Sequence, residues 1–415
     1  MAADPRIGSS HLNPIHRTGE LGGEARQSLR FSDLHLEPVN KGGRGAGGHC
    51  FIKDFAAFRE LYKKHVGDEL GIRVLESMEN KNIDLMISSN KDLDLLLGVY
   101  GDEVVVMPTQ AAQKRKARCL VTGGAGFIGS NLVDELIARG NEVVVIDNLL
   151  TGKRENINPA AEFYEHDIRN LAAIKPIFEG VDYVFHVAAF PRVQPSIDDP
   201  ITSHDINVNG TVNVLKAALD AKVKRVIYSA SSSAYGNQGK MPLREDMPAS
   251  PISPYALQKH LGELYCALFS KIYGLPTVSL RYFNVYGHRQ SLGGAYALVM
   301  AIFIRQRLNN EPLTITGDGE QRRDFTNVAD VVRANILAAN SSKVGQGEVI
   351  NIGRGSNYSV NDIARFIGGP TINIVPRLEP RETLADISLA RELLGWEPSV
   401  NLPEWLEEYK KELGL

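Results

Sequence analysis

The sequence predicts an α/β protein whose core is a doubly wound parallel sheet. From Cys119 onward, apolar runs typical of strands, such as Tyr183–Val187 and Thr277–Arg281, alternate with helical segments. This alternation is typical of a parallel sheet that helices cover on both faces. A second observation is the glycine-rich turn Thr122–Gly129, which joins the first of these strands to the first helix.

Length and composition limit the class of protein. The 415 residues, 43% hydrophobic and 23% charged, fit a globular protein of two or three domains. The net charge of −3 gives no reason to expect nucleic acid or an anionic membrane as a partner. Three scattered cysteines predict neither a disulfide framework nor a metal site. Because no apolar leader or long apolar run is found, we expect a cytoplasmic protein.

The first 112 residues differ in character from the rest. Residues 1–40 are polar and aperiodic, which predicts a flexible segment. Within residues 41–112, a glycine cluster at 42–48 precedes apolar residues at three- and four-residue spacings, which predicts a helical appendage. Residues 117–415 then form the main domain, whose smaller α/β lobe is expected mainly after residue 284.

The turn at 122–129 has the features of a dinucleotide site of Rossmann type. Gly123 would permit the tight turn, Gly126 the approach of pyrophosphate, and Gly129 close packing of the helix on the strand. The helix N-terminus would offer amide donors to the phosphates. Asp147 ends the next strand, where its carboxylate can accept from ribose hydroxyls and would repel a 2′-phosphate. The sequence therefore predicts NAD rather than NADP as the cofactor.

The spacing Gly-x-x-Gly-x-x-Gly resembles the extended short-chain dehydrogenase/reductase superfamily, and within it the nucleotide-sugar epimerases and dehydratases. The resemblance runs from about residue 118 to the C-terminus. It implies NAD as cofactor, a UDP-sugar substrate and a homodimer paired through helices. The cofactor contacts that it implies beside the glycines are Phe127, Ile128, Asp147, Asn148, Asp167, Ile168, Ala188, Ala189, Asn207, Tyr255, Lys259 and Tyr282.

Tyr255 and Lys259 are the candidate catalytic pair. Their i, i+4 spacing on a helix that follows Pro254 puts both side chains on one face. A nearby ammonium group and the positive nicotinamide ring would lower the pKa of tyrosine from about 10, so that the phenol could act as a base. The serine-rich segment 229–233 would supply the third group. The family pattern selects Ser231, with Ser232 and Ser233 as alternatives.

The residues around these serines favour one reaction of the family. The related 4,6-dehydratases carry acidic residues just after the catalytic hydroxyl, and the decarboxylases carry a glutamate in this loop. Here the positions hold Ser232, Ser233 and Ala234. We therefore expect inversion at C4 of a UDP-hexose through a 4-keto intermediate. The alternatives are a nucleotide-sugar dehydratase or decarboxylase, and a non-catalytic NAD-binding regulator.

The resemblance also implies the substrate contacts. Tyr282 would help to close the nicotinamide pocket, Asn284 would contact the sugar diphosphate, and Arg323 would bind the diphosphate bidentately. Arg377 is a second candidate for the diphosphate, with Arg381 as its alternative. Thr383 corresponds to a pocket-wall position where a small residue leaves room for an N-acetyl group. The expected substrate is therefore UDP-glucose/galactose or UDP-N-acetylglucosamine/galactosamine, and uronic acids are not excluded.

A separate resemblance lies in the appendage. The segment around Cys50 is similar to the active-site cysteine loop of UDP-sugar 6-dehydrogenases, whose thiolate attacks an aldehyde intermediate. Ile52 replaces the proline usual there, and no dinucleotide fingerprint precedes the segment. We expect an assembly element rather than an independent dehydrogenase.

Overall fold

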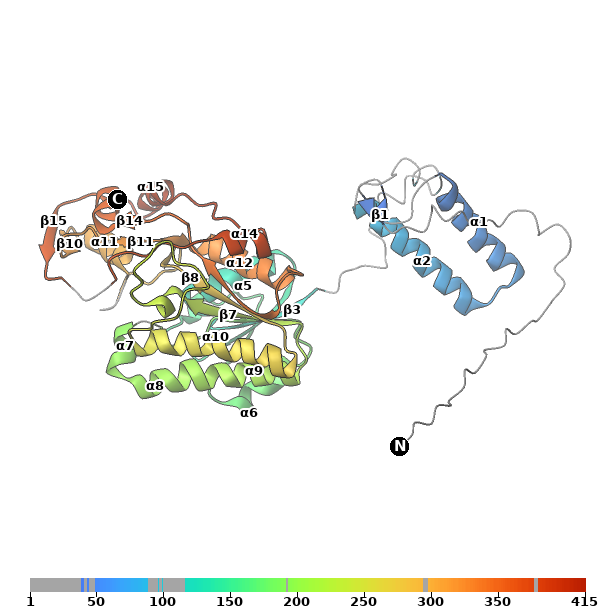
Figure 1. Cartoon of the computed structure of the whole chain (residues 1–415), viewed down its shortest axis with the longest axis horizontal. Helices are drawn as coiled ribbons and strands as arrows, with labels where there is room; N and C mark the ends of the chain where they lie inside the picture. Colours follow the sequence, from blue (N-terminus) through green and yellow to red (C-terminus); the bar gives the residue numbers. More distant parts are fainter. Residues whose placement is uncertain are drawn as a thin grey trace, which may run out of the picture. The chain divides into compact units, whose positions relative to one another are not determined.

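The structure is a computed structural model that describes residues 39–40, 43–44, 49–88, 96, 99, 116–191, 193–293, 298–376 and 380–415. It divides the chain into two compact units, residues 1–115 and residues 116–415. Each unit is described by itself (Figure 1).

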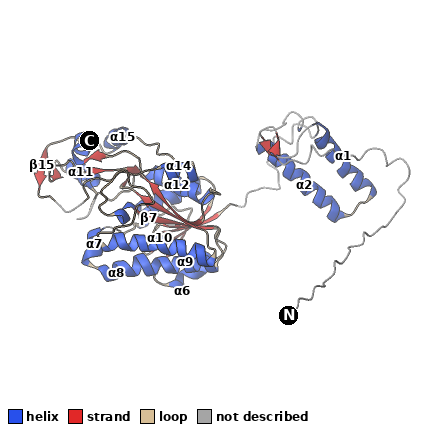
Figure 2. Ribbon diagram, viewed as in Figure 1, coloured by secondary structure: helices blue, strands red, loops and turns tan. Residues whose placement is uncertain are grey.

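The described part of the first unit is mainly helical (Figure 2), which confirms the helical character predicted for this region. Helices α1 (His49–His65) and α2 (Glu69–Ser88) pack on each other, and the short strands β1 (Val39–Asn40) and β2 (Gly43–Arg44) pair antiparallel. An ion pair of 2.5 Å between Arg59 and Glu79 joins the two helices. Cys50 falls in the first turn of α1 rather than in a loop. The flexible segment expected for residues 1–40 lies, except for β1, outside the described residues.

The second unit contains a seven-stranded, fully parallel sheet in the order β13-β8-β7-β6-β3-β4-β5. Its strands are β3 (Arg118–Thr122), β4 (Glu142–Asp147), β5 (Glu162–Glu165), β6 (Tyr183–His186), β7 (Arg225–Ser231), β8 (Thr277–Tyr282) and β13 (Gln346–Ile352). Cys119 and Val121 face one hydrophobic core, whereas Leu120 faces the other. Both faces of the sheet are therefore buried, as the apolar strands predicted.

Helices cover each face of this sheet, which confirms the doubly wound prediction. On one face lie α5 (Phe127–Ala138), α12 (Val328–Asn340) and α14 (Ser388–Leu394), and on the other lie α6 (Leu171–Ile174), α9 (Gly210–Asp220) and α10 (Pro254–Tyr273) (Figure 1). The strand order reverses between β3 and β6. In open α/β sheets, ligands bind in the crevice at this reversal, beyond the carboxyl ends of the strands.

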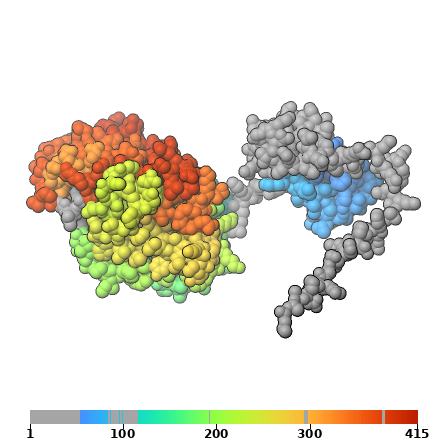
Figure 3. Space-filling view, viewed as in Figure 1, coloured from blue at the N-terminus to red at the C-terminus, as the bar shows by residue number. Residues whose placement is uncertain are grey.

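The smaller lobe is built mainly from the last third of the chain, which gathers on one side of the unit (Figure 3). Its buried residues, including Phe303, Phe325 and Leu406, form a third hydrophobic core. The lobe contains β9 (Val285–Tyr286), α11 (Val299–Leu308), β10 (Leu313–Thr316), β11 (Arg322–Arg323), β12 (Thr326–Asn327), β14 (Tyr358–Ser359), α13 (Val360–Ile367), β15 (Thr371–Ile374) and α15 (Leu402–Glu412). Two further short helices, α7 (Val193–Asp198) and α8 (Pro200–His204), lie next to α10. Among the described residues, no helix is long and apolar enough to span a membrane.

Candidate active site

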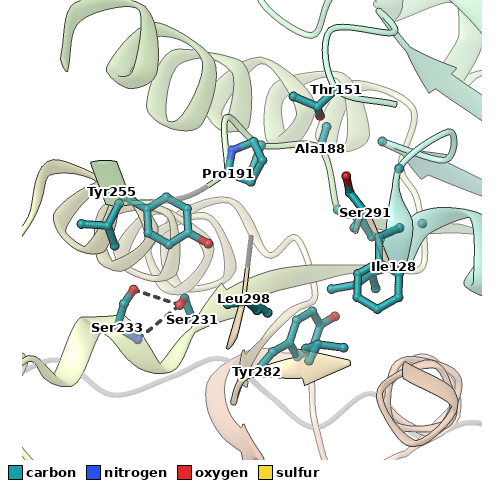
Figure 4. A pocket seen from close by; sticks show the side chains of 18 of the residues that line it. Ile128, Thr151, Ala188, Pro191, Ser231, Ser233, Tyr255, Tyr282, Ser291 and Leu298 are labelled. Atoms are coloured by element: carbon teal, nitrogen blue, oxygen red, sulfur yellow. Dashed lines mark hydrogen bonds between the residues drawn. The ribbon is translucent and has the colours of Figure 1, made fainter. Parts of the chain in front are cut away.

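A cavity of about 1750 Å³ opens at the carboxyl ends of the parallel strands (Figure 4). It brings together most of the residues singled out from the sequence. Those that line it are Gly123, Gly126, Phe127, Ile128, Gly129, Asp147, Asn148, Asp167, Ile168, Ala188, Ala189, Ser231, Ser232, Tyr255, Tyr282, Asn284, Arg323 and Thr383. The predicted cofactor and substrate groups thus share one continuous space.

The glycine turn forms the floor of the cavity at the strand reversal. Gly123 adopts a φ of +75°, and a Cβ there would lie 2.7 Å from the backbone nitrogen of Ala188. A Cβ at Gly129 would overlap the carbonyl oxygen of Gly123. Glycine at these two positions therefore permits the tight turn and the close packing at the start of α5. A Cβ at Gly126, which lines the cavity, would meet only the Gly123 carbonyl oxygen, at 3.2 Å, so a ligand can approach the backbone there. A turn that carries no side chain at these glycines, at the N-terminus of a helix, fits the pyrophosphate of a dinucleotide.

Two carboxylates mark one end of the cavity. Asp147 ends β4 and accepts backbone N–H groups from Ala125 and Leu149 at 3.0 and 2.8 Å. Burial raises its pKa, and the two N–H donors act in the opposite direction. Asp167 accepts from the Asn148 amide at 2.9 Å and from the guanidinium of Arg169 at 2.8 and 3.0 Å. The hydrogen bonds from Arg169 lower the pKa of Asp167 to about 2.

Two residues that the sequence assigned to the cofactor do not line the cavity. Asn207 is buried in a π-helical turn, Asp205–Asn209, where its side chain exchanges hydrogen bonds with the backbone of Phe190 and donates to Gln258 at 2.8 Å. It therefore holds the segment after Ala189 rather than facing the cavity. Lys259 lies deeper than Tyr255 and is 4% exposed.

Tyr255 projects from the first turn of α10 into the cavity (Figure 4). The helix starts there because Ser253 caps it, accepting from the N–H of Ala256 at 3.2 Å, and Pro254 occupies the first helical position. The backbone N–H of Tyr255 also donates to the Ser196 hydroxyl at 3.0 Å. Burial raises the pKa of Tyr255, while the Ser231 hydroxyl acts in the opposite direction. Among the protein groups burial therefore has the larger effect, and the lowering of this pKa expected from Lys259 together with the nicotinamide ring stays a prediction.

The three serines that follow β7 are not equivalent. Ser231 Oγ accepts from both the backbone N–H and the hydroxyl of Ser233, at 3.2 and 2.9 Å (Figure 4). With both of these donors pointing at it, the Ser231 proton is left to donate elsewhere. The Ser233 hydroxyl donates its proton to Ser231, so in this arrangement Ser231 and not Ser233 has a hydroxyl proton free for a ligand.

The other end of the cavity holds the residues expected to face the substrate. The Tyr282 hydroxyl is bonded to Ser229 and Asn335 at 3.0 and 2.9 Å, so its ring rather than its hydroxyl faces the cavity. The Asn284 amide donates to the Asp324 carbonyl at 3.0 Å and lies 3.4 Å from Thr383 Oγ1. Arg323 lines the same wall.

The second arginine of the predicted diphosphate site is not resolved in favour of either candidate. Arg377 lies outside the described residues. Its alternative, Arg381, is not part of the cavity wall and forms a bidentate ion pair with Asp318 at 2.8 and 2.9 Å.

The cavity also has lining residues that sequence reasoning missed. They include Pro191, Val193, Ile197, Ile252, Arg289 and Leu298. These residues come from loops and from the short helix α7, where no periodicity or motif marks a position as facing a ligand. For all of them except Arg289, the one available signal is apolar character beside exposed loops, which also fits ordinary surface residues.

Comparison with known proteins identifies the family of this chain. A profile of the NAD dependent epimerase/dehydratase family matches residues 119–353. The chain belongs to this family. Family members are NAD-dependent, and the glycine turn described above fits that cofactor.

Three solved structures that are similar to this chain are 4-epimerases named for different UDP-sugars. A UDP-glucose 4-epimerase from Thermotoga maritima, solved with UDP-glucose, is 41% identical, with a TM-score of 0.68, covering 71% of this chain and 99% of that one. A UDP-N-acetylglucosamine 4-epimerase from Methanobrevibacter ruminantium is 37% identical, with a TM-score of 0.68 and coverage of 71% and 97%.

The third is a UDP-glucuronic acid 4-epimerase from Bacillus cereus, solved with UDP-glucuronic acid and NAD. It is 35% identical, with a TM-score of 0.66 and coverage of 71% and 99%. The similar proteins also include a UDP-N-acetyl-alpha-D-glucosaminuronate decarboxylase from Bacillus cytotoxicus, 40% identical over 61% of this chain and 79% of its own.

Proposed function

We propose that the protein is an NAD-dependent UDP-sugar 4-epimerase. The observation that carries the proposal is the position of the Tyr255 phenol, which faces the same cavity as the glycine turn and as Arg323. A base placed between a dinucleotide cradle and a diphosphate-binding cation can act on a sugar hydroxyl. The similarity to 4-epimerases described above supports this reading.

The residues at the carboxylate end would hold the cofactor. The turn Gly123–Gly129 would take the pyrophosphate, and Asp147 would accept from the ribose hydroxyls with the lone pairs that its backbone contacts leave free. Asp167 and Ile168 would border the adenine. Ala188 and Ala189 would line the path toward the nicotinamide, with the Tyr282 ring on its far side.

The chain's own groups would handle the proton of the sugar 4-hydroxyl. NAD, when bound, supplies the oxidant for C4 and a positive charge near the phenol. Tyr255 would remove the hydroxyl proton as C4 becomes a ketone, and Ser231 would donate a hydrogen bond to the same sugar oxygen. The 4-keto sugar would then turn over in the site before its reduction from the opposite face. The proton would return from Tyr255, so no net oxidation occurs.

The distribution of acidic residues favours epimerisation over the alternatives. Of the described acidic side chains, those that line the cavity are Asp147, Glu155 and Asp167, all at or after the ends of β4 and β5. None of them belongs to the segment of Ser231–Ser233. A dehydratase or decarboxylase of this family would use such a group there. The intact Tyr255–Lys259 pair argues against a non-catalytic regulator.

The wall near Thr383 bears on the choice of UDP-sugar. Thr383 Oγ1 is 3.3 Å from the backbone nitrogen of Asp324, which accounts for its orientation, and its side chain is small. A small side chain leaves room for an N-acetyl group. We therefore infer that UDP-N-acetylglucosamine/galactosamine and UDP-glucose/galactose are both substrates.

We further propose a cytoplasmic homodimer paired through α10. On this helix Leu257, Leu264, Leu268 and Ile272 fall on one face and are 44–60% exposed. Such an apolar stripe on the surface of a helix is typical of an interface, and a second copy of α10 would cover it. Light scattering of the wild type and of Leu264→Glu would test this, since the charge should produce monomers.

The test of the function is direct. Purified protein is incubated separately with UDP-glucose, UDP-N-acetylglucosamine and UDP-glucuronate, and the configuration at C4 is followed by NMR. We expect the C4-inverted product from the first two, without consumption of added NAD. Absence of an inverted product from all three substrates, or a stoichiometric demand for NAD, would refute the proposal.

A further inference from the structure

The surroundings of Lys259, rather than the cavity itself, carry a further inference. The Lys259 ammonium lies 4.7 Å from the centre of the Tyr228 ring. Tyr228 is in β7 and is 1% exposed, and Lys259 is 4% exposed. A cation within about 6 Å of an aromatic centroid is attracted by the ring, more strongly when both are desolvated.

The Tyr228 ring is fixed in place by the helix it packs against. A Cβ at Gly262 of α10 would lie within 2.8 Å of Tyr228 Cε1 and still closer to its phenol oxygen. The phenol of Tyr228 therefore occupies the space that a side chain at position 262 would need. The phenol oxygen then lies 3.4 Å from the Lys259 carbonyl oxygen. The ring, the glycine and the lysine form one interlocking contact between strand and helix.

A neutral histidine also lies next to the Tyr228 ring. The His186 ring centre is 5.6 Å from that of Tyr228. His186 Nε2 lies 2.9 Å from Thr211 Oγ1, whose own proton goes to the Asn207 carbonyl, so Nε2 carries the proton. Nδ1 accepts from Thr122 Oγ1 at 2.7 Å. Both nitrogens are therefore satisfied by the neutral ring, and no second cation competes with Lys259 for the Tyr228 face.

We propose that Tyr228 is a positioning residue that holds the Lys259 ammonium in place and in its charged form behind Tyr255, with Gly262 making room for its phenol. The inference rests on the proposed function in one respect, namely that Lys259 takes part in the epimerase reaction. It goes beyond the Tyr255–Lys259–Ser231 set because Tyr228 touches neither the cavity nor the reacting atoms.

The other groups around Lys259 set the direction of the expected effect. Burial lowers the pKa of Lys259 to about 8, while Glu263 and Cys266 on the same helix raise it. The Glu263 carboxylate is shared with Arg281 at 2.7 and 2.8 Å and with His260 at 2.9 Å. His186 from β6 is neutral, and Tyr255 lies one turn before the lysine. Removal of the Tyr228 ring should therefore lower the pKa of Lys259 further.

The test compares Tyr228→Leu, Tyr228→Phe and Phe185→Leu. Phe185 is equally buried but packs in the core on the other face of the sheet, so its variant controls for loss of an aromatic residue. Because Lys259 is too buried for a reagent to reach it, its pKa is read by NMR from the pH dependence of its ¹³Cε chemical shift in protein with ¹³C-labelled lysine, independently of activity. We expect a fall of about one pH unit in Tyr228→Leu alone. Lys259 would then be about half charged at pH 7 instead of about nine-tenths charged. We therefore also expect about a twofold lower kcat at pH 7, growing to about tenfold near pH 9, with KM within about twofold, and recovery in Tyr228→Phe.

Fluorinated phenylalanines at position 228 guard against a folding defect. They weaken the negative face of the ring at nearly constant volume, so the pKa of Lys259 should fall stepwise with each fluorine. An unchanged titration of Lys259 through this series, or an equal shift in Phe185→Leu, would overturn the proposal. If the variants shift the pKa of Lys259 as expected but the wild type does not invert C4, the positioning role of Tyr228 stands and the proposed function fails.

Discussion

The two ends of the cavity differ in charge, and the difference separates binding from chemistry. At the end formed by β4 and β5, Asp147 and Asp167 are held by backbone N–H groups, an amide and a guanidinium. At the end formed by β7 and α10, the groups that line the cavity next to Tyr255 are hydroxyls and apolar side chains, and Arg323 lines the substrate wall beyond them. Fixed carboxylates suit recognition of a bound cofactor, whereas uncharged lining groups around one phenol make its ionisation sensitive to the few charges close to it.

The largest expected effect removes the phenol at the uncharged end. Tyr255→Phe should lower kcat by about 10³-fold or more, because general acid–base catalysis by one side chain contributes about 10²–10⁴-fold. NAD content should remain within twofold of the wild type. Epimerase assays and cofactor release by denaturation measure both. Tyr265→Phe, on the same helix but not lining the cavity, is the matched control. Equal activity in Tyr255→Phe and Tyr265→Phe would refute the assignment.

The next effect is at the glycine turn. In Gly129→Ala the new methyl group would overlap the Gly123 carbonyl, so the turn must shift and we expect NAD to bind on the order of 100-fold more weakly. Isothermal titration of the NAD-free protein measures this. Gly239→Ala is the control, since its Cβ meets nothing within 4 Å. Tight NAD binding by a folded Gly129→Ala protein would show that the turn is not the cradle.

A smaller effect is expected at the charged end. Asp147→Asn removes the charge and leaves one of the N–H groups of Ala125 and Leu149 without its acceptor. NAD should bind about tenfold more weakly, and the preference for NAD over NADP should shrink. Glu135→Gln, an exposed carboxylate of α5, provides the comparison. An unchanged NAD/NADP ratio in Asp147→Asn would contradict the role given to this carboxylate.

The smallest effect concerns stability toward acid. Burial lowers the pKa of His186 to about 3, and Lys259 adds to this. The unfolded chain therefore binds a proton that the folded one does not between about pH 6.5 and 3, and stability falls as the pH drops through this window. At pH 5 the loss is about 2 kcal/mol. Urea denaturation of the wild type and His186→Asn across pH 7 to 5 measures it. An identical pH dependence in both proteins would contradict the account.

The sequence predicted the ends of the strands far better than the packing behind them. Gly123, Asp147 and Ser231 follow or end apolar runs, and parallel topology brings such positions to one edge. Tyr255 was found instead from its spacing to Lys259 at the start of a helix. Tyr228 was missed because its contact with Lys259 joins a strand to a helix, and nothing in local spacing encodes that pairing. Asn207 does not line the cavity, because its buried side-chain amide donates hydrogen bonds to the Phe190 carbonyl and to Gln258. Roles for the lining residues stay predictions until the variants are measured.

The most direct measurement uses a UDP-hexose deuterated at C4. The account holds that the hydrogen on C4 leaves with its electrons and returns to the same carbon inside a closed site, while Tyr255 handles only the hydroxyl proton. NMR and mass spectrometry of the products in ordinary water should therefore find inverted sugar that still carries deuterium at C4. Inverted product with ordinary hydrogen at C4, or no inversion at all, would contradict it.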